Sequence, residues 1–161
     1  MIKWIVIAIV AAAILLVIAG QLGFYRGSAP LDLGVTDGKL KPPSGTTNSV
    51  SSQAGLYADH PMREAASVAP IRYAGDGAAA LARLRAVVEA MDRAKIVRSE
   101  PLYLHAEFTS KWFKFVDDVE FLVDESAGVM HVRAAARLGQ KDFGVNRARV
   151  EMIRARFWGG S

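Results

Sequence analysis

Five side chains that can bind a metal or carry a proton recur at alternating positions in three short stretches of this sequence: His105, Glu107, Asp118, Glu120 and His131. In an extended strand, residues i and i+2 project from the same face. The pairs in the first two stretches therefore share a face of their strands. Imidazole and carboxylate groups are ligands that zinc prefers in proteins. The pattern indicates either a metal site or acid–base groups on one face of a sheet.

Arg133 alternates with apolar residues in the same way as His131 and supports a second interpretation. An arginine competes with a metal for carboxylates, because opposite charges on neighbouring strands form cross-strand ion pairs. Polar residues must face polar ones across a hairpin when its other face is buried. This rule predicts a loop at residues 124–127 and two structural pairs, Glu120 with His131 and Asp118 with Arg133. A structural ion-pair lattice is the ordinary interpretation, and the metal site is the alternative.

A second candidate site is formed by four arginines near the end of the chain: Arg133, Arg137, Arg147 and Arg149. Two of them fall in the first turns of an expected helix, directly after a turn at residues 142–144. Free N–H groups at a helix N-terminus, together with guanidinium groups, bind a carboxylate or phosphate. The alternative is that these arginines neutralise three acidic residues inside the fold, namely Asp117, Asp118 and Asp142.

Alternation of apolar and polar residues between Ile96 and Ala136 predicts the strands that carry these groups. We expect antiparallel strands at about residues 102–109, 116–123 and 129–136, with a further short strand at 71–73. Their apolar faces need a covering layer, which the flanking segments supply.

Two amphipathic helices complete the expected domain. Asp76 is a suitable N-cap for a helix over residues 77–94. A second helix is expected to begin at about residue 143 or 145 and to end at 157, and either Asp142 or Asn146 is its N-cap. The predicted fold class is α+β: a two-layer domain with a three- to four-stranded antiparallel sheet packed against two helices, preceded by a transmembrane helix.

The segment from Trp4 to Gly20 contains no charged side chain and is long enough to cross a bilayer core of about 30 Å. An uncleaved anchor is the preferred interpretation, and a cleaved signal peptide is the alternative. Lys3 and the terminal amine outweigh Arg26, which favours a body outside the cytoplasm, on the periplasmic side in a bacterium. A cytoplasmic body is the alternative.

Composition divides the chain into three parts. Residues 1–26 are the anchor with its flanks, residues 27–53 are a Pro/Gly/Ser/Thr-rich linker or ordered arm, and residues 54–161 are the α+β domain. Two of the 20 basic residues flank the anchor, so the rest carries 18 against 16 acidic residues. That balance argues against nucleic acid as a partner. The absence of cysteine excludes disulfides and thiolate metal sites.

Three aromatic residues surround two lysines between the expected strands 102–109 and 116–123. They are Trp112, Phe113 and Phe115; Lys111 precedes them, and Lys114 lies between Phe113 and Phe115. Packing in the core is the ordinary expectation for alternate aromatics. A membrane-facing or partner-facing edge is the alternative.

Several longer strings resemble a known family. They are FVDDVEF at 115–121, HVRAAAR at 131–137, DFGVNRARVE at 142–151 and NSVSSQ at 48–53. Together they make most of residues 31–157 similar to the domain of unknown function 1499 family. The resemblance implies bacterial envelope and plastid relatives, often with an N-terminal membrane segment, and no established activity. The family often has cysteines near Ser49 and Ser44, so any thiol role is lost here.

These observations predict a membrane-anchored envelope protein that acts as a non-enzymatic ligand-binding or protein-interaction module. The alternative is an enzyme, with or without a metal, that uses the charged sheet face. No catalytic residue is assigned, and no cofactor is strongly implied. The expected partners are the bilayer, through residues 4–20, and an envelope protein or a small anionic molecule.

Overall fold

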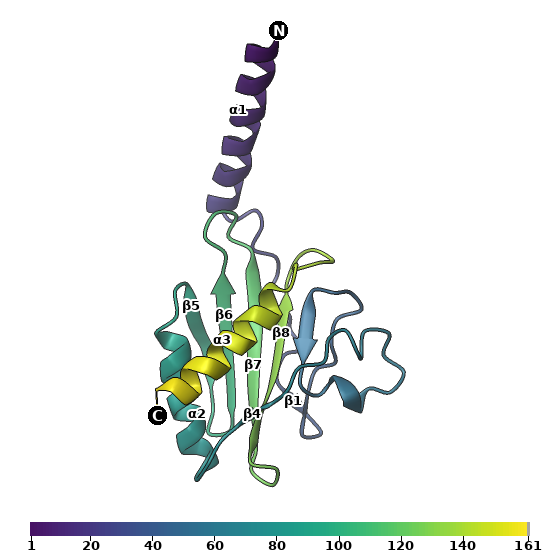
Figure 1. Cartoon of the computed structure of the whole chain (residues 1–161), viewed down its shortest axis with the longest axis vertical. Coiled ribbons are helices and arrows are strands. Elements are labelled where there is room, and N and C mark those ends of the chain that lie inside the picture. Colours follow the sequence, from purple (N-terminus) through teal and green to yellow (C-terminus); the bar gives the residue numbers. More distant parts are fainter. Residues whose placement is uncertain (161) are drawn as a thin grey trace.

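The computed structural model describes residues 1–160, and α1 (Ile2–Gln21) stands away from the rest of the chain as a single rod (Figure 1). The remaining helices are α2 (Gly77–Glu89), α3 (Val145–Gly159) and the 3₁₀ helix η1 (Ala54–Leu56). The chain after α1 forms an α+β domain, which confirms the predicted fold class.

The sheet has six antiparallel strands, more than the three or four predicted. They are β3 (Ser49–Ser51), β4 (Ile71–Arg72), β5 (Ala94–Ser99), β6 (Tyr103–Thr109), β7 (Val116–Asp124) and β8 (Val129–Ala136). Their order is β3-β8-β7-β6-β5, and β4 also pairs with β8. Two strands, β1 (Val35–Thr36) and β2 (Lys39–Leu40), form a separate hairpin. Strand β3 is too short for alternation to reveal it.

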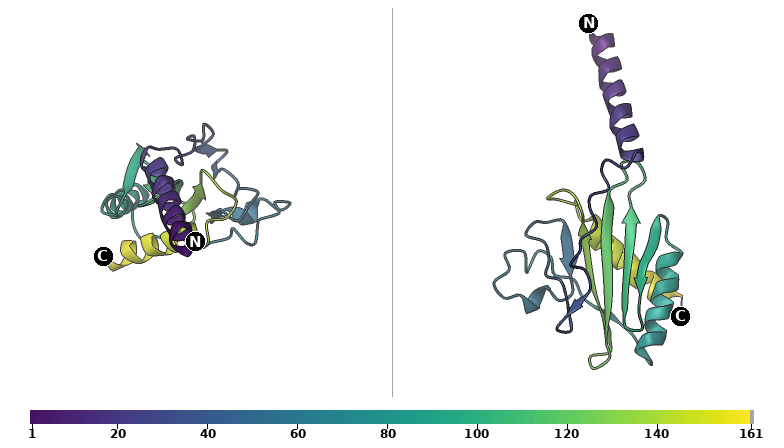
Figure 2. Two further views of the ribbon diagram at one scale, coloured as in Figure 1. Left: turned by 90° about the horizontal axis from the view of Figure 1, so that it is seen from above. Right: turned by 180° about the vertical axis from the view of Figure 1, so that it is seen from behind.

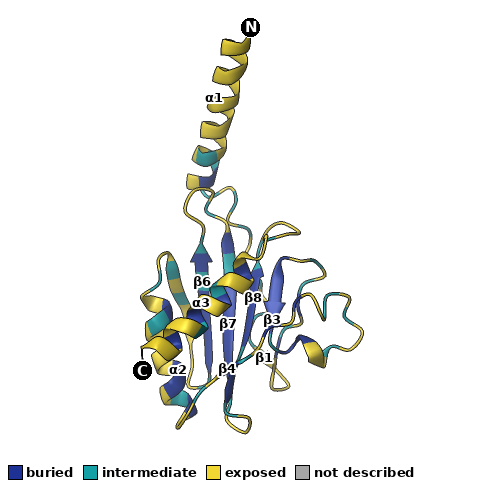
Figure 3. Cartoon of the chain, in the orientation of Figure 1, coloured by how far each residue is buried: buried dark blue, intermediate teal, exposed yellow. Residues whose placement is uncertain are grey.

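Both α2 and α3 pack against one face of the sheet and enclose the main hydrophobic core (Figures 1 and 3). Alternate residues of the central strands point into this layer, including the fully buried Leu104 and Phe121. Leu84 of α2 and Ile153 of α3 are fully buried in the same cluster. The predicted apolar stripes therefore meet the predicted apolar faces.

Capping groups begin the two domain helices near the predicted positions. The Asp76 carboxylate accepts the Ala79 N–H at 2.7 Å, which confirms its role as the N-cap of α2. The helix ends at Glu89 rather than at residue 94, because the chain turns at Arg93, where φ is 58°, and then enters β5.

At α3, Asp142 is the capping side chain, and the alternative cap Asn146 is not. The two Asp142 oxygens accept the N–H groups of Gly144 and Asn146 at 3.0 and 2.8 Å. The Asn146 side chain is buried and donates to the Asn48 carbonyl at 3.2 Å. It thereby ties α3 to the chain entering β3.

The register of the β7–β8 hairpin differs by two residues from the prediction. Glu120 lies opposite Arg133, and Asp124 lies opposite Val129. The Asp124 carboxylate accepts the Ala127 N–H at 3.0 Å, and Gly128 has a φ of 62°. A left-handed conformation is easy only for glycine, so Gly128 belongs to the turn and not to the strand. A shift of two preserves both faces, so alternation alone does not exclude it.

Residues 27–48, which lead from α1 to β3, lie across the other face of the sheet, as the rear view in Figure 2 shows. We call this segment the arm. Leu40 of the arm is buried with Tyr103 and Leu122 in a second apolar cluster. Gln53 accepts the Leu40 N–H through its side chain at 2.8 Å. The sheet is therefore covered on both sides, by helices and by the arm.

Helix α1 is strongly apolar, and the rest of the chain buries it only at Gly20, in its last turn. Its length and composition suffice to cross a membrane. A signal sequence has the same two properties.

Candidate functional site

The first group of charged residues lies beneath the arm and not on an open surface. Asp118 binds Arg137 through both carboxylate oxygens, at 2.8 Å to Nε and 2.8 Å to Nη2. His105 Nε2 lies 2.8 Å from the same carboxylate, and Glu107 accepts from Arg137 Nη2 at 2.5 Å. Only 5% of the Arg137 side chain and 2% of the Asp118 side chain are exposed. Four of the charged residues thus form one closed cluster.

The protonation state of this cluster follows from its hydrogen bonds. Burial by itself raises the pKa of Asp118, but the hydrogen bonds from Arg137 and His105 together outweigh it and leave the pKa below 3.8. The same hydrogen bond to Asp118 raises the pKa of Arg137. Both groups are therefore held in their charged forms.

A second closed cluster surrounds Glu120, whose side chain is fully buried. It accepts the Gly34 N–H at 2.8 Å, the Tyr103 hydroxyl at 2.8 Å and Arg133 Nη1 at 3.3 Å. Arg133 Nε also donates to the Pro42 carbonyl at 3.0 Å. Burial first, and then the charge of Glu120, raise the pKa of Tyr103. Two of these partners come from the arm, which seals the cluster.

The predicted pairs were wrong because the register differs. Glu120 pairs with Arg133 rather than with His131, and Asp118 pairs with Arg137 and His105 rather than with Arg133. His131 lies apart, 3.7 Å from Asp124. Within residues 1–160, no three His, Asp or Glu side chains are placed to hold a metal ion. The geometry is that of the ion-pair lattice.

The structure does not bring the four candidate arginines together. Arg133 and Arg137 lie under the arm, whereas Arg147 and Arg149 extend from α3. Arg147 donates to the backbone carbonyls of Ser67 and Ala65, both at 2.8 Å. Its guanidinium therefore holds the segment before β4 against α3. The alternative, that the arginines neutralise three acidic residues, holds for two of them, because Asp117 and Asp118 have arginine partners. The third, Asp142, caps α3 instead.

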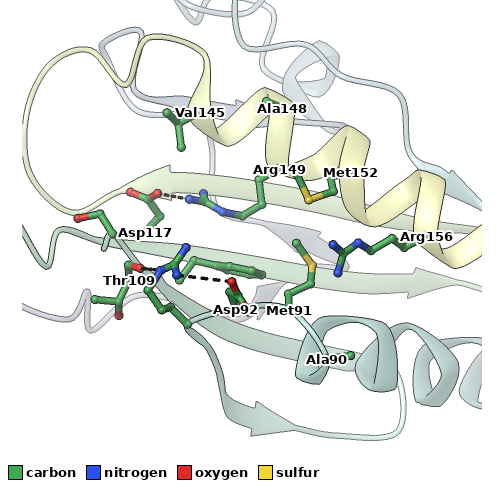
Figure 4. A pocket seen from close by; sticks show the side chains of 13 residues that line it. Ala90, Met91, Asp92, Thr109, Asp117, Val145, Ala148, Arg149, Met152 and Arg156 are labelled. Atoms are coloured by element: carbon green, nitrogen blue, oxygen red, sulfur yellow. Dashed lines mark hydrogen bonds and ion pairs between the residues drawn. The ribbon is translucent and has the colours of Figure 1, made fainter. Parts of the chain in front are cut away.

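Arg149 lines an open cleft of about 620 Å³ between the end of α2 and α3, with β6 and β7 as its floor (Figure 4). Its guanidinium binds Asp117 at 2.6 Å and lies 4.8 Å from the centre of the Phe108 ring. Burial raises the pKa of Asp117, and the nearby Arg149 offsets this only in part. The cleft thus holds an ion pair beside an aromatic ring.

The remaining walls of the cleft are apolar with additional positive charge (Figure 4). Met152 of α3 and Met91, in the turn that follows α2, line it from opposite sides, and Arg156 extends into it beside Met91. Arg156 is exposed and makes no side-chain hydrogen bond or ion pair with the described residues. Arg93 donates to the Thr109 carbonyl at 3.2 Å and contacts Asp92 at 3.6 Å. Three guanidinium groups therefore face two carboxylates.

Sequence reasoning placed Arg149 among the candidates but missed the cleft around it. Arg149, Met152 and Arg156 are spaced i, i+3 and i+7, so they share one stripe of α3. That stripe is the signal available in the sequence. The other wall of the cleft comes from the end of α2, which is distant from α3 in the sequence.

No curated protein and no solved structure matches this chain. A family model described as "Protein of unknown function (DUF1499)" matches residues 39–157. This range includes β2, the sheet, α2, α3 as far as Phe157, and every residue of the two closed clusters except Gly34. The match confirms the resemblance seen in the strings near β3, β7, β8 and α3. The chain belongs to the DUF1499 family.

Proposed function

We propose that this chain is a single-pass membrane protein whose domain binds a small anionic ligand with an apolar portion in the cleft between α2 and α3. The observation that carries the proposal is the composition of the cleft. Arg149 and Arg156 reach it beside Phe108, Met91 and Met152. In this proposal the domain binds and does not catalyse.

The connection of α1 to the domain supports an uncleaved anchor. Gly20 is buried against the backbone of Phe113, where an added Cβ would lie 2.7 Å from the Phe113 Cα. The Gln21 side chain donates to the Trp112 carbonyl at 2.9 Å. A segment that is removed during export does not need such contacts. With Lys3 inside and the domain outside, the cleft lies on the extracytoplasmic side.

The chemistry of the cleft matches the proposed ligand. Small-molecule sites measure about 300–1,000 Å³ and combine apolar walls with a few polar groups. Guanidinium groups bind carboxylates and phosphates through paired hydrogen bonds. The flexible thioethers of Met91 and Met152 adapt to an apolar group of varied shape. Asp117 opposes anion binding, which makes it a useful position for a test.

The alternative, an enzyme at the charged sheet face, receives no support from this geometry. The Glu120 side chain is fully buried, and Asp118 is 1% exposed. Their oxygens accept from protein donors on the strands, on the arm and at Arg137, directly after β8. A substrate therefore reaches these groups only if the arm leaves the sheet.

The test is calorimetric titration of the full chain in nanodiscs with octyl phosphate below its micelle concentration, corrected with empty nanodiscs. We expect saturable binding at one site, and no binding of octyltrimethylammonium, which has the same chain and the opposite charge. Arg156→Ala should weaken binding by about fivefold or more, and Asp117→Asn should strengthen it. Arg72→Ala, an exposed residue of β4, is the matched control.

Equal heats from the two amphiphiles would overturn the proposal, because the ligand would then be recognised by its chain alone. Unchanged affinity in both Arg156→Ala and Asp117→Asn would place the binding site elsewhere.

A further inference from the structure

Exposed aromatic and aliphatic side chains gather at one end of the domain. Strands β6 and β8 end there and β7 begins there, so the loops at residues 110–115 and 137–144 share that end with the C-terminus of α1 (Figure 1). We call it the anchor-proximal end. Its exposed apolar residues are Trp112, Phe113, Phe115, Leu138 and Phe143, with exposed fractions of 59, 38, 41, 42 and 95%.

Loop 110–115 is fixed directly beside the last turn of α1. Besides the Gln21 hydrogen bond, the Tyr25 ring stacks on Phe115 with centroids 5.6 Å apart, and Phe113 lies 6.4 Å from Tyr25. These aromatics contact one another, but they do not enter the core, so the ordinary expectation for them was wrong. They remain at the level where the apolar helix ends.

The second loop is held at the same end by the arm. An added Cβ at Gly27 would lie 2.8 Å from the Arg137 Cβ and 3.0 Å from Leu138 Cγ, so the chain after α1 touches the start of this loop. Phe143 has a φ of 53°, a conformation that bulky residues rarely adopt, and it stays almost wholly exposed. An aromatic ring held outward at such a cost indicates a partner that covers it.

Charge separates the two ends of the domain. The two loops of the anchor-proximal end carry three lysines, Lys111, Lys114 and Lys141, and one carboxylate, Asp142, which caps α3. At the opposite end, the turns at 73–76, 100–102 and 125–128 contain Asp76, Glu100 and Glu125, and the β1–β2 hairpin beside them adds Asp37 and Lys39. Acidic residues therefore outnumber basic ones at that end. This distribution matches a negatively charged surface on the side of α1 only.

We propose that the anchor-proximal end docks on the headgroup region of the bilayer, with Trp112 and its neighbours inserted at the interface. Tryptophan is enriched at this depth, and lysine extends its ammonium group to the headgroups while its stem stays in apolar surroundings. The proposal rests on the membrane anchoring proposed above and adds a second contact, made by the domain itself. The partner is therefore the lipid surface: its apolar interior meets the aromatic side chains, and its anionic headgroups meet the lysines.

Tryptophan quenching tests this contact, because the three tryptophans lie at three levels: Trp4 in α1, Trp112 in loop 110–115 and Trp158 near the end of α3. The full chain is reconstituted in phosphatidylcholine–phosphatidylglycerol vesicles whose acyl chains carry bromine near the carbonyl end. Each tryptophan is measured alone, with the other two replaced by phenylalanine. Trp158 is the matched control, since its exposed fraction of 50% resembles that of Trp112 and it lies away from α1.

We expect Trp112 to lose about half of its emission in brominated vesicles and Trp158 to lose little. Lys111→Glu with Lys114→Glu should reduce the quenching of Trp112 in anionic vesicles more than in neutral ones. If Trp4 is quenched while Trp112 behaves like Trp158, the docking proposal is wrong and the anchoring proposal stands. If Trp4 is not quenched, the anchoring proposal fails and the docking proposal fails with it.

Discussion

Asp117 and Asp118 are neighbours on β7, and they belong to two different regions of the molecule. Asp118 faces the arm, where Arg137 and His105 hold its pKa below the ordinary value. Asp117 faces the helices, where it lines the open cleft and burial raises its pKa despite Arg149. Each carboxylate has an arginine partner. The covering layer, and not the residue types, therefore separates a structural ion pair from a candidate site.

The largest effect is expected where the covering layer is complete. Glu120→Ala leaves Arg133 buried without its partner and removes the acceptor of the Gly34 N–H and the Tyr103 hydroxyl. We expect a loss of about 3–5 kcal/mol in the free energy of unfolding, measured by urea denaturation of the full chain in detergent. A loss below about 1 kcal/mol would show that the arm does not seal this cluster.

The pH dependence of stability tests the closed environment of Asp118. Because the pKa of Asp118 is lower in the folded chain than its ordinary 3.8, its contribution to stability is complete above that value. The contribution is lost as the pH falls through the lower folded pKa. Asp118→Asn should therefore be less stable than the original chain by a constant amount from about pH 7 to pH 5, with the two converging below about pH 4. Parallel curves down to pH 2 would contradict this assignment.

A smaller effect is expected for Arg147, which is less enclosed than the closed clusters but, unlike Arg156, has hydrogen-bond partners. Its guanidinium is exposed but donates to the carbonyls of Ala65 and Ser67. Arg147→Ala should cost about 1 kcal/mol and should leave octyl phosphate binding unchanged. Loss of binding without loss of stability would instead make Arg147 part of an anion site at the start of α3.

The smallest effect on stability is expected in the open cleft between α2 and α3. Arg156→Ala removes a side chain that has no hydrogen-bond or ion-pair partner among the described residues, so the melting temperature should change by less than about 1 °C. Calorimetry of the variant and the original chain checks this. A clear destabilisation would mean that Arg156 is structural, and its use as a binding test would lose its meaning.

Local patterns predicted most of the sheet and both domain helices. Alternation identified β6, β7 and β8. Asp76 was recognisable as a cap, and Asp142 as one of two candidate caps, because their acceptor oxygens lie at helix starts. The arm has no periodic pattern. Its position depends on contacts such as Gly34 with Glu120, which join residues far apart in the sequence. For that reason the charged sheet face looked like a surface when the sequence alone was read.

The candidate site was harder to predict than the fold. A register error of two residues leaves every face intact but changes every partner, so the correct charged residues were assigned to the wrong pairs. The cleft requires the end of α2 and one stripe of α3 to meet over Phe108 and Asp117. No single stretch of sequence contains that arrangement.

The contact between Gly20 and the backbone of Phe113 also determines how a ligand can reach the cleft. A domain on a flexible linker sweeps a hemisphere and captures partners at a distance. Here the proposed anchor ends against the domain itself, so in the membrane-bound state the cleft stays at a fixed height and tilt. Encounters then depend on lateral diffusion in the plane of the bilayer, and molecules that travel in or along that plane meet the cleft far more often than those in bulk solution.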